Sequence, residues 1–466
     1  MYSAHVRYLR FRGRTLPDEV LEDYLRLFPD RPPLPRVQSI NMWSSSAYQP
    51  SSCLQWSRFL LRSSTLAENR PSAPASTLKH LRICCSPWDY KSEGARLLAL
   101  DLVAFQHSNV KLGGGLEVLK MVDHNSFQMD HTFPYQDVIE NAFVLPPTET
   151  VDSPASGLRH IEVAHFRYDL PDFFERVAKM RALEHLKIVI LEDDSTWEME
   201  DKESVQHSLS SLEIEGFWWD LSPAINLCPS PSATAQLRTL RLHYHQKDRA
   251  WSGASVTQVL DLPAGIIPPD HLEALTIDVV DYPHVEFLNH KAPVLTTNAL
   301  QPLLRYRQMV RLHLGLPCSI CLDIKFLYAL AAVMGGTLSH LVVLRAIAYH
   351  WNDPFQPMLT VEDLSLIAGV LFPRVETLGL QVPWHDTPSY AERNCSAASF
   401  LLKTLLVGTE ILFGQESSNV ATFLKGCFPG LQNLYQYRQD YGYNDGWWHV
   451  VRTNGYHGGH YVPGII

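Results

Sequence analysis

One short pattern repeats along the chain: an apolar residue, two variable residues, an apolar residue, one variable residue and an apolar residue. Leu78–Ile83 (Leu-Lys-His-Leu-Arg-Ile) and Val375–Leu380 (Val-Glu-Thr-Leu-Gly-Leu) are two of its fourteen copies. The copies begin at residues 6, 37, 78, 116, 158, 183, 209, 237, 272, 309, 338, 375, 402 and 431. A pattern that recurs every few tens of residues is typical of repeat proteins, in which each unit packs on its neighbours, so it predicts a solenoid.

Helical segments are predicted ahead of several copies. Thr360–Leu371 combines an N-cap threonine, acids in the first turn and apolar residues at helical spacing, and a Phe-Pro pair then ends it. Asp169–Met180 and Val420–Cys427 precede their copies in the same way. Within the repeated pattern, the last two apolar residues lie two apart and so share one face of a strand. Parallel strands joined by helices therefore predict an α/β fold with one continuous core.

The fold that fits these elements is an irregular leucine-rich-repeat solenoid, a horseshoe of short parallel strands with helices on its outer face. We expect this solenoid to cover residues 1–434. Residues 435–466 are rich in aromatic residues and glycine and are expected to form a C-terminal cap or tail that seals the core. Insertions at residues 63–76, 145–157 and 228–235, and an acidic one at 192–203, fall between copies, where a solenoid tolerates extra length on its rim.

Composition and charge exclude several classes of protein. The net charge of −10 disfavours a nucleic-acid binder, because phosphate binding needs clustered Lys and Arg. Met1–Arg14 lacks the apolar segment of a signal peptide, and the most apolar stretch, Phe326–Leu344, contains two glycines and a copy of the pattern. We therefore expect no membrane span and a cytoplasmic or nuclear location. The eight scattered cysteines are then predicted to be reduced thiols.

Two stretches carry a family resemblance. Leu364–Leu380, with Leu-Phe-Pro-Arg-Val-Glu-Thr-Leu, and Phe423–Leu434, with Cys-Phe-Pro-Gly-Leu-Gln-Asn-Leu, resemble the repeat region of fungal F-box/leucine-rich-repeat proteins. The resemblance is one of apolar spacing, and it extends over nearly the whole chain. It implies that the repeats recognise the substrate of an SCF-type ubiquitin ligase, while an F-box binds the SCF adaptor. The alternative that stays open is a scaffold or inhibitor that acts without a ligase.

The adaptor-binding module is represented by a single short segment. Leu16–Leu21 (Leu-Pro-Asp-Glu-Val-Leu) resembles the start of an F-box, Leu-Pro-x-Glu-x-Leu. It lies between the first two copies of the pattern, however, and three prolines follow it at residues 32, 33 and 35. An ordinary repeat helix with proline in its first turn explains the same residues.

No catalytic signature occurs in the sequence, such as Gly-x-Ser-x-Gly, His-Glu-x-x-His or a kinase motif, so we expect no enzyme and no cofactor. Cys318-Ser-Ile-Cys321 has the spacing of a redox pair or half a zinc site. His243 and His245 share a strand face, as two metal ligands would. Both pairs lack evident further ligands, and structural thiols or exposed polar residues explain them equally, so no metal site is predicted.

The variable residue between the last two apolar positions alternates with core residues and is expected to face the concave side of the horseshoe. In the first eight copies this position holds mostly bases, namely Arg10, Asn41, Arg82, Lys120, Glu162, Lys187, Glu213 and Arg241. Histidines recur two residues earlier, at His80, His160, His185 and His340. In later copies Val342, Gly379 and Leu406 occupy the position and predict a stretch that prefers apolar contacts.

This row predicts a protein-binding surface. Its candidate residues are Arg82, Lys120, Lys187, Arg241, His160 and His185. Because guanidinium and ammonium groups bind carboxylates and phosphates, the expected partner is a protein with an acidic or phosphorylated segment. The alternative is that an exposed strand face simply carries polar residues.

Overall fold

A computed structural model describes most of the repeats. The described residues are 6–12, 23, 26–27, 37–43, 60–61, 77–85, 93–111, 115–123, 157–166, 173–174, 177, 180, 182–190, 209–217, 221, 237–245, 260, 270–281, 294–316, 319–345, 358–387, 399–408, 414–437 and 445–461. The F-box-like Leu16–Leu21, His245 as a side chain, Cys318 and the predicted insertions (except Gly157) lie outside them.

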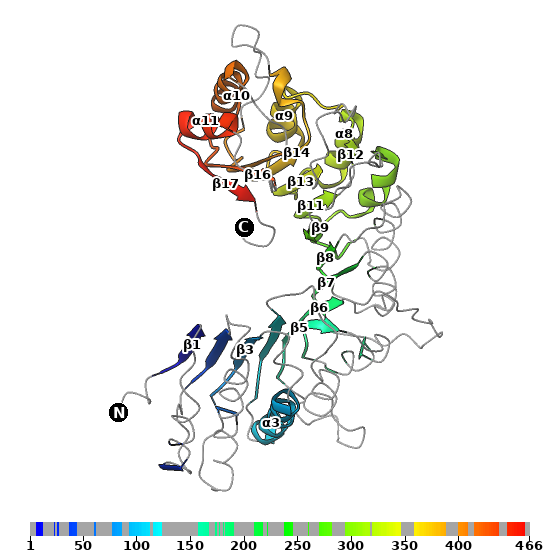
Figure 1. The fold of residues 1–466 in the computed structure, drawn as a ribbon. Helices are drawn as coiled ribbons and strands as arrows, with labels where there is room; N and C mark the ends of the chain where they lie inside the picture. The colour runs from blue at the N-terminus through cyan, green and yellow to red at the C-terminus, as the bar shows by residue number, and fades with distance from the viewer. Residues whose placement is uncertain are drawn as a thin grey trace, which may run out of the picture. The chain divides into compact units, whose positions relative to one another are not determined.

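The chain divides into two compact units (Figure 1). Unit 1 comprises Met1–Gly216 and Asn226–Gln236. Unit 2 comprises Phe217–Ile225 and Leu237–Ile466.

Unit 1 contains a parallel sheet whose strands follow one another in chain order, from β1 to β7. The strands are β1 (Tyr8–Arg12), β2 (Ser39–Trp43), β3 (His80–Cys85), β4 (Val118–Asp123), β5 (His160–Phe166), β6 (His185–Ile190) and β7 (Ser211–Phe217). Helix α3 (Glu93–Lys111) connects β3 to β4 and turns Leu98, Leu102 and Phe105, all fully buried, toward the core.

Unit 2 contains a second run of parallel strands in the order β8-β9-β11-β13-β14-β15-β16-β17. They are β8 (Thr239–His245), β9 (Ala274–Asp281), β11 (Arg311–Leu316), β13 (His340–Arg345), β14 (Thr377–Leu380), β15 (Thr404–Val407), β16 (Asn433–Tyr437) and β17 (His457–Tyr461). A separate two-stranded sheet pairs β10 (Val294–Thr296) with β12 (Ser319–Cys321).

The helical segments of unit 2 are η5 (Thr297–Arg305), α8 (Ile324–Met334), α9 (Asp363–Leu366), the π-helical turn η6 (Ile367–Leu371), η7 (Trp384–Asp386), α10 (Gly414–Cys427) and α11 (Asp445–Asn454). Figure 1 shows α8, α9 and α10 on one side of the unit 2 strands. The molecule is thus a mixed α/β protein with long parallel strand runs, an arrangement compatible with the predicted solenoid.

Every copy of the repeated pattern forms a strand of these runs, and each strand begins two residues after its copy does. Equivalent positions pair across strands, so Leu9 lies opposite Ile40, and Ile40 opposite Leu81. The carbonyl of the residue before each strand fixes this register: that of Arg7 accepts from the N–H groups of both Gln38 and Ser39. The same two-donor contact recurs from repeat to repeat. The predicted strands are therefore confirmed.

The three apolar positions of each copy form the core. Leu78, Leu81 and Ile83 are at most 2% exposed, and Leu272, Leu275 and Ile277 are fully buried. Burying one such side chain stabilises the fold by about 1.5–3 kcal/mol, and here the gain recurs with every repeat. Hydrophobic burial along the repeat, more than any single contact, holds each unit together.

Within the predicted helix Thr360–Leu371, the helical residues run from Asp363 to Leu371, and Thr360 bonds to the first of them. The Asp363 N–H donates to Thr360 Oγ1 (3.3 Å), while Asp363 Oδ2 accepts from the Thr360 N–H (2.8 Å), a reciprocal cap. After one α-helical turn the backbone changes to a π-helical turn, which ends at Phe372. Helix α10 begins at Gly414, six residues before the predicted start, and ends at the predicted Cys427. Of Asp169–Met180, the described Phe173, Phe174 and Val177 are helical.

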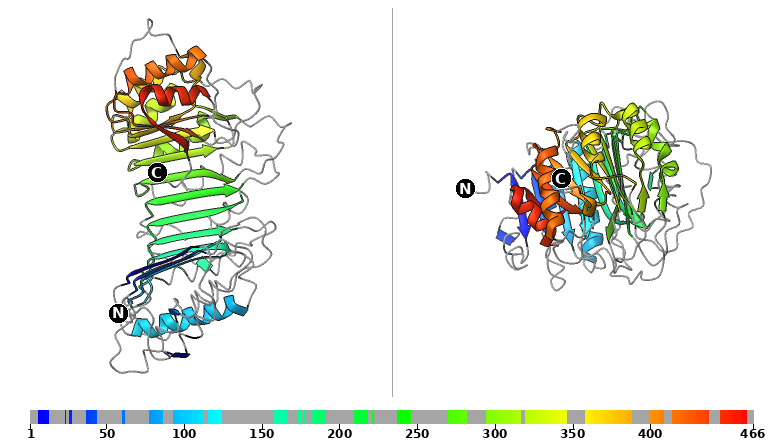
Figure 2. Two further views of the ribbon diagram at one scale, coloured as in Figure 1. Left: turned by 60° about the vertical axis from the view of Figure 1, so that its left-hand side comes forward. Right: turned by 90° about the horizontal axis from the view of Figure 1, so that it is seen from above.

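The C-terminal segment adds one more helix and strand. Helix α11 packs beside α10, and β17 pairs with β16 as the last strand of the run (Figure 2). The side chain of Val450 is buried, and Asn454 Nδ2 donates to the Ala421 carbonyl of α10 (2.8 Å). Gly458 allows the close contact of α11 with β17, because a Cβ there would meet the Val451 methyl carbons at 2.8 Å. The described helices include none that is long and apolar enough to cross a membrane.

Candidate protein-binding face of unit 1

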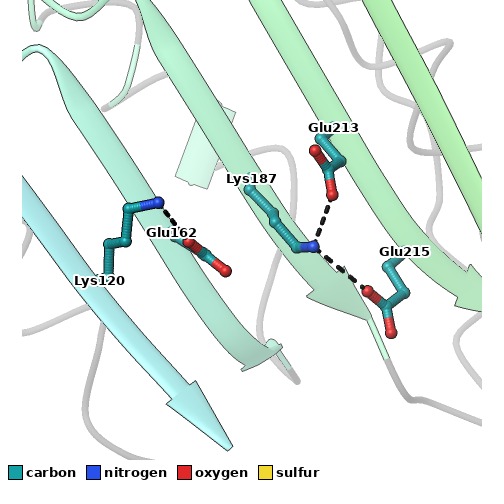
Figure 3. Close-up of polar contacts among 5 residues, drawn as sticks. All are labelled: Lys120, Glu162, Lys187, Glu213 and Glu215. Carbon is teal, nitrogen blue, oxygen red and sulfur yellow. Dashed lines mark hydrogen bonds and ion pairs between the residues drawn. The ribbon is translucent and has the colours of Figure 1, made fainter. Parts of the chain in front are cut away.

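The predicted row of charged residues forms a ladder across strands β4 to β7. Register places Lys120 opposite Glu162, Glu162 opposite Lys187, and Lys187 opposite Glu213. Glu215 follows two residues later on the same face of β7. We call Lys120, Glu162, Lys187, Glu213 and Glu215 the charged ladder (Figure 3). Its side chains project from the strand face opposite to the core positions, because residues alternate between the two faces of a strand.

The two lysines of the charged ladder are paired with its acids. Lys120 Nζ lies 3.0 Å from Glu162 Oε2. Lys187 Nζ donates to Glu213 Oε1 at 2.5 Å and lies 3.6 Å from Glu215 Oε2 (Figure 3). The five side chains are only 14–30% exposed, so water screens these pairs less than it screens ordinary surface pairs. Two lysines and three glutamates carry a net charge of −1, so this stretch presents charges of both signs.

Burial and charge act in opposite directions on Lys187. Burial by itself lowers the pKa of its ammonium group, but the charges of Glu213 and Glu215 and the hydrogen bond to Glu213 outweigh it and raise the pKa. The lysine therefore stays protonated at every physiological pH. Since Glu213 and Glu215 both contact this one cation, Lys187 is the centre of the charged ladder.

His160 and His185 lie next to the charged ladder on the neighbouring row. Their rings are 5.6 Å apart, on directly paired positions of β5 and β6. Burial, with a further contribution from the charge of Lys120, lowers the pKa of His160 to about 4. At neutral pH this imidazole is uncharged, so it offers a partner hydrogen bonds and ring contacts but no positive charge.

Cationic character persists at the β1–β3 end of the row. Arg82 lies opposite Lys120 on one side and Asn41 on the other, and Asn41 lies opposite Arg10. Arg82 Nε and Asn41 Oδ1 are buried without hydrogen-bond partners. Like charges on paired positions repel, and Lys120 forms its ion pair with Glu162, on the strand away from Arg82. An anion that bound at this end would be attracted by the guanidinium groups of Arg82 and Arg10.

Arg241, the remaining predicted site residue, belongs to unit 2, where it lies opposite Thr276. The described residues of unit 1 thus bring together Arg82, Lys120, Lys187, His160 and His185. Within unit 2, the positions that follow Arg241 along the row are Thr276, His313 and Val342, none of which carries a full charge of the kind seen in the charged ladder.

The apolar stretch predicted for the later repeats is buried in unit 2. Val342 and Leu406 are fully buried, as is Leu344 on the adjacent row. A Cβ on Gly379 would contact all three, at 3.0–3.1 Å. The prediction that this stretch offers apolar contacts to a partner is wrong, because its side chains already pack inside the protein.

The same buried face contains a histidine pair. His313 Nδ1 and His340 Nε2 lie 3.2 Å apart, the rings are stacked with their centres 5.5 Å apart, and both residues are buried. Burial, followed by the charge of Arg311, lowers the pKa of His340 to about 3. The His340 ring is therefore neutral at pH 7, and which of the two nitrogens donates in this hydrogen bond depends on the tautomers of the rings.

The described residues include no group of three or more His, Cys, Asp and Glu side chains placed to hold a metal ion. His243 lies opposite Asp278, and Cys321 is a free thiol whose pKa is raised by burial, the reverse of an activated redox cysteine. Cys427 is disulfide-bonded, so the prediction that all eight cysteines are reduced is wrong at this position.

Sequence reasoning missed the pairing within the charged ladder. Glu162 and Glu213 are visible as acids in the predicted row, but Glu215, two residues after Glu213 on the same strand, falls outside that row. The signal is present: in parallel strands with one register, residues at the same pattern position are neighbours, and this position alternates Lys120, Glu162, Lys187, Glu213. Alternation of sign along a repeat predicts ion pairs, whereas a tally of bases and acids predicts only an average charge.

Comparisons with known proteins leave the family open. A scan against protein-family models finds no match, and a search of curated proteins finds no matching sequence.

Proposed function

We propose that this protein is an irregular leucine-rich-repeat solenoid that recognises another protein through the strand face of unit 1. The observation that carries the proposal is the charged ladder with its two histidines, a partly exposed row of fixed charges on repeating strands. The leucine-rich-repeat horseshoe and its concave side belong to this proposal. They are supported by the parallel strand order, the confirmed register and the helices on one side of the unit 2 strands.

The arrangement of charges suits a protein partner of defined sequence. Ion pairs on neighbouring strands lie about 5 Å apart, so a bound segment meets positive and negative charges in a fixed order. Such a pattern rejects partners whose charges fall out of order, because like charges in contact are costly. An acidic or phosphorylated residue of the partner fits the Arg82 end, where cations lack counter-charges in the same row.

We propose the role of substrate receptor in an SCF-type ubiquitin ligase on the basis of the resemblance to fungal F-box/leucine-rich-repeat proteins. In that role the repeats bind the target, and Leu16–Leu21 contributes to contact with the SCF adaptor.

A ligase-independent scaffold or inhibitor is the second candidate, and one observation favours it. Strands β1 and β2 are paired directly, so Leu16–Leu21 lies in the connection between two adjacent strands of one sheet. A connection between neighbouring repeats is where an ordinary repeat helix is expected. Direct binding of a purified SCF adaptor separates the two candidates: binding that Leu16→Asp and Leu21→Asp abolish supports the receptor, and its absence supports the scaffold.

The binding face is tested by exchanging two charges. In the double variant Lys187→Glu, Glu213→Lys the central ion pair is kept but its direction is reversed, which inverts the pattern that a partner meets. We expect affinity capture from cells, quantified by mass spectrometry, to lose the main partner, while circular dichroism stays unchanged. The matched control is Glu376→Lys, Lys403→Glu, which reverses an exposed pair in unit 2 and should retain the partner. Equal capture by both variants would remove the charged ladder from the recognition surface.

A further inference from the structure

Among the described residues, strand β1 stands at the end of the strand order and pairs with β2 alone, so no described strand covers its other edge (Figure 1). Its core positions are also less covered than those of other repeats. Val6 and Leu9 are partly exposed, whereas their equivalents Val37 and Ile40 are 5% and 2% exposed. The side chain of Tyr8 is 74% exposed.

The backbone of β1 presents hydrogen-bonding groups at this edge. Because the Arg7 carbonyl accepts from Gln38 and Ser39, residue 7 faces β2. Backbone groups of successive residues in a strand point to opposite sides, so Leu9 also faces β2 while Tyr8 and Arg10 face the open edge. An exposed strand edge of this kind is a template for pairing with another strand.

Charge rows in unit 1 show which side chains fit beside such an edge. On the strand face, Lys120 is matched by Glu162 on the next strand. On the row before the strands, Lys79 Nζ lies 3.1 Å from Glu117 Oε1, and Arg159 Nη1 lies 3.7 Å from Glu184 Oε1. In this sheet a cation is thus repeatedly matched by a glutamate at the same pattern position of a neighbouring strand.

At β1 both rows end in an unmatched cation. Arg7 ends the row before the strands, and Arg10 ends the row on the strand face; both are exposed, and the described residues provide neither with an ion pair. Their neighbours on the β2 side are the uncharged Gln38 and Asn41. Acids on the open side of β1 would match both cations.

We propose that the open edge of β1 binds an extended segment of a partner protein as an added parallel strand. The segment carries acids at positions i and i+3, opposite Arg7 and Arg10, and an apolar residue at i+2 that covers Leu9. Backbone hydrogen bonds to Tyr8 and Arg10 supply affinity, and the two acids supply register and specificity. This inference deepens the proposed protein recognition and rests on it, but it uses a surface different from the charged ladder.

The probe is a blocked peptide, acetyl-Ser-Leu-Glu-Ser-Leu-Glu-Ile-Ser-amide with a fluorophore, added to the full chain at low salt. The first glutamate of the peptide stands at position i, and its second glutamate stands at i+3. We expect saturable binding by fluorescence anisotropy, and slowed hydrogen exchange at the amides of Tyr8 and Arg10. A peptide with lysine in place of both glutamates should bind at least roughly tenfold more weakly, and Arg10→Glu should reverse that preference.

Proline at residue 10 tests the backbone directly. Arg10→Pro removes an N–H that faces the open edge and leaves the bonds to β2 in place, a position where edge strands tolerate proline. It should abolish peptide binding with unchanged circular dichroism. Arg10→Ala, which keeps the N–H, should only weaken binding. If Arg10→Pro and Arg10→Ala bind the acidic peptide equally, or if Tyr8 and Arg10 show no added protection, strand addition is overturned.

Further outcomes show whether another molecule occupies the β1 edge, or separate the strand-addition proposal from the proposed function. A concentration-dependent dimer by light scattering that Arg10→Pro dissolves would assign the edge to a second copy of the chain and overturn the proposal. A second outcome is that reversal of Lys187 and Glu213 abolishes capture of the cellular partner, while the peptide does not bind at β1. This outcome would support the proposed function and overturn the strand-addition proposal. Loss of peptide binding in Arg10→Pro together with an intact response to charge exchange supports both.

Discussion

The strand faces opposite the core differ in burial between the two units, although the same repeated pattern forms both. In unit 1 the variable position of the pattern carries the charged ladder, whose side chains remain partly exposed. In unit 2 the same position carries His313, Val342 and Leu406, which are buried. One unit therefore has an apolar core on one side of its strands, while the other has buried side chains on both sides.

The repeat thus determines where the strands lie. The residues at one variable position determine whether the strand face opposite the core is accessible to a partner protein. Parallel strands buried on both faces are usual in α/β proteins, and unit 2 follows that rule around Gly379, Val342 and Leu344. Unit 1 departs from it because Lys120, Glu162 and Lys187 cannot be buried at low cost. Charge at this position keeps the face of unit 1 available.

The largest effect is expected from placing a charge on the buried face. Val342→Lys puts an ammonium group at a fully buried site without a counter-charge, and should destabilise unit 2 by about 3–5 kcal/mol. Urea unfolding followed by circular dichroism measures the change. The matched exchange in unit 1, Lys120→Val, should alter the free energy of unfolding by at most about 1 kcal/mol. Comparable losses in the two variants would mean that the faces do not differ.

A smaller effect is expected from adding one methyl group to the same face. Gly379→Ala brings a Cβ within 3.0–3.1 Å of Leu344, Leu406 and Val342, and this overpacking should cost about 1–3 kcal/mol. Gly157, ahead of β5 in unit 1, has nothing within 4 Å of such a Cβ, so Gly157→Ala is the control and should be neutral. Thermal unfolding of both variants gives the comparison. An unchanged Gly379→Ala protein would show that the unit 2 face is loosely packed.

The histidines predict a pH effect that differs between the units. Burial holds the pKa of His340 at about 3, below the ordinary 6.5, so the unfolded chain binds a proton that the folded chain does not. Stability that is fully present above pH 6.5 is therefore lost as the pH falls toward 3. Between pH 7 and pH 5 the loss should be about 2 kcal/mol at most.

The variant His340→Phe isolates this term. Urea unfolding at pH 7 and pH 5 should show a smaller loss of stability for His340→Phe than for the native protein. The charged neighbour Arg311 and the second imidazole, His313, remain in both proteins. His160→Phe in unit 1 should change the pH dependence in the same direction, and the two histidines should separate only below about pH 4, where the contribution of His160 stops growing while that of His340 continues toward pH 3. An identical pH dependence with and without His340 contradicts the assignment.

The smallest effects separate the charged ladder from ordinary surface ion pairs. A double-mutant cycle on Lys187 and Glu213 should give a coupling of about 1 kcal/mol, since both side chains are mostly shielded from water. The same cycle on Lys403 and Glu376, which are about half exposed and 2.8 Å apart, should give about 0.3 kcal/mol. Added salt should weaken the second coupling more than the first. Equal couplings would make the charged ladder an ordinary set of surface pairs.

Much of the fold followed from local patterns. The apolar spacing located fourteen of the fifteen strands in the two parallel runs, but not β10 and β12, which pair apart from them. The Thr360 cap was predictable because threonine and aspartate three residues apart satisfy the first free N–H groups of a helix. Strand β17 was not predicted, since Gly458 and Gly459 lack the apolar side chains that mark the other strands. Its place depends on contact with α11 and β16, which are separate elements of the chain.

The candidate site was predictable in part. Neighbouring residues of the site could be read from the repeat, because a constant register in parallel strands makes equal pattern positions neighbours. The ion pairs of Lys120 and Lys187, the neutral state of His160 and the burial of the Val342 face could not be read from it. Register follows from backbone hydrogen bonds between successive repeats, whereas burial and charge balance depend on every group that surrounds a side chain.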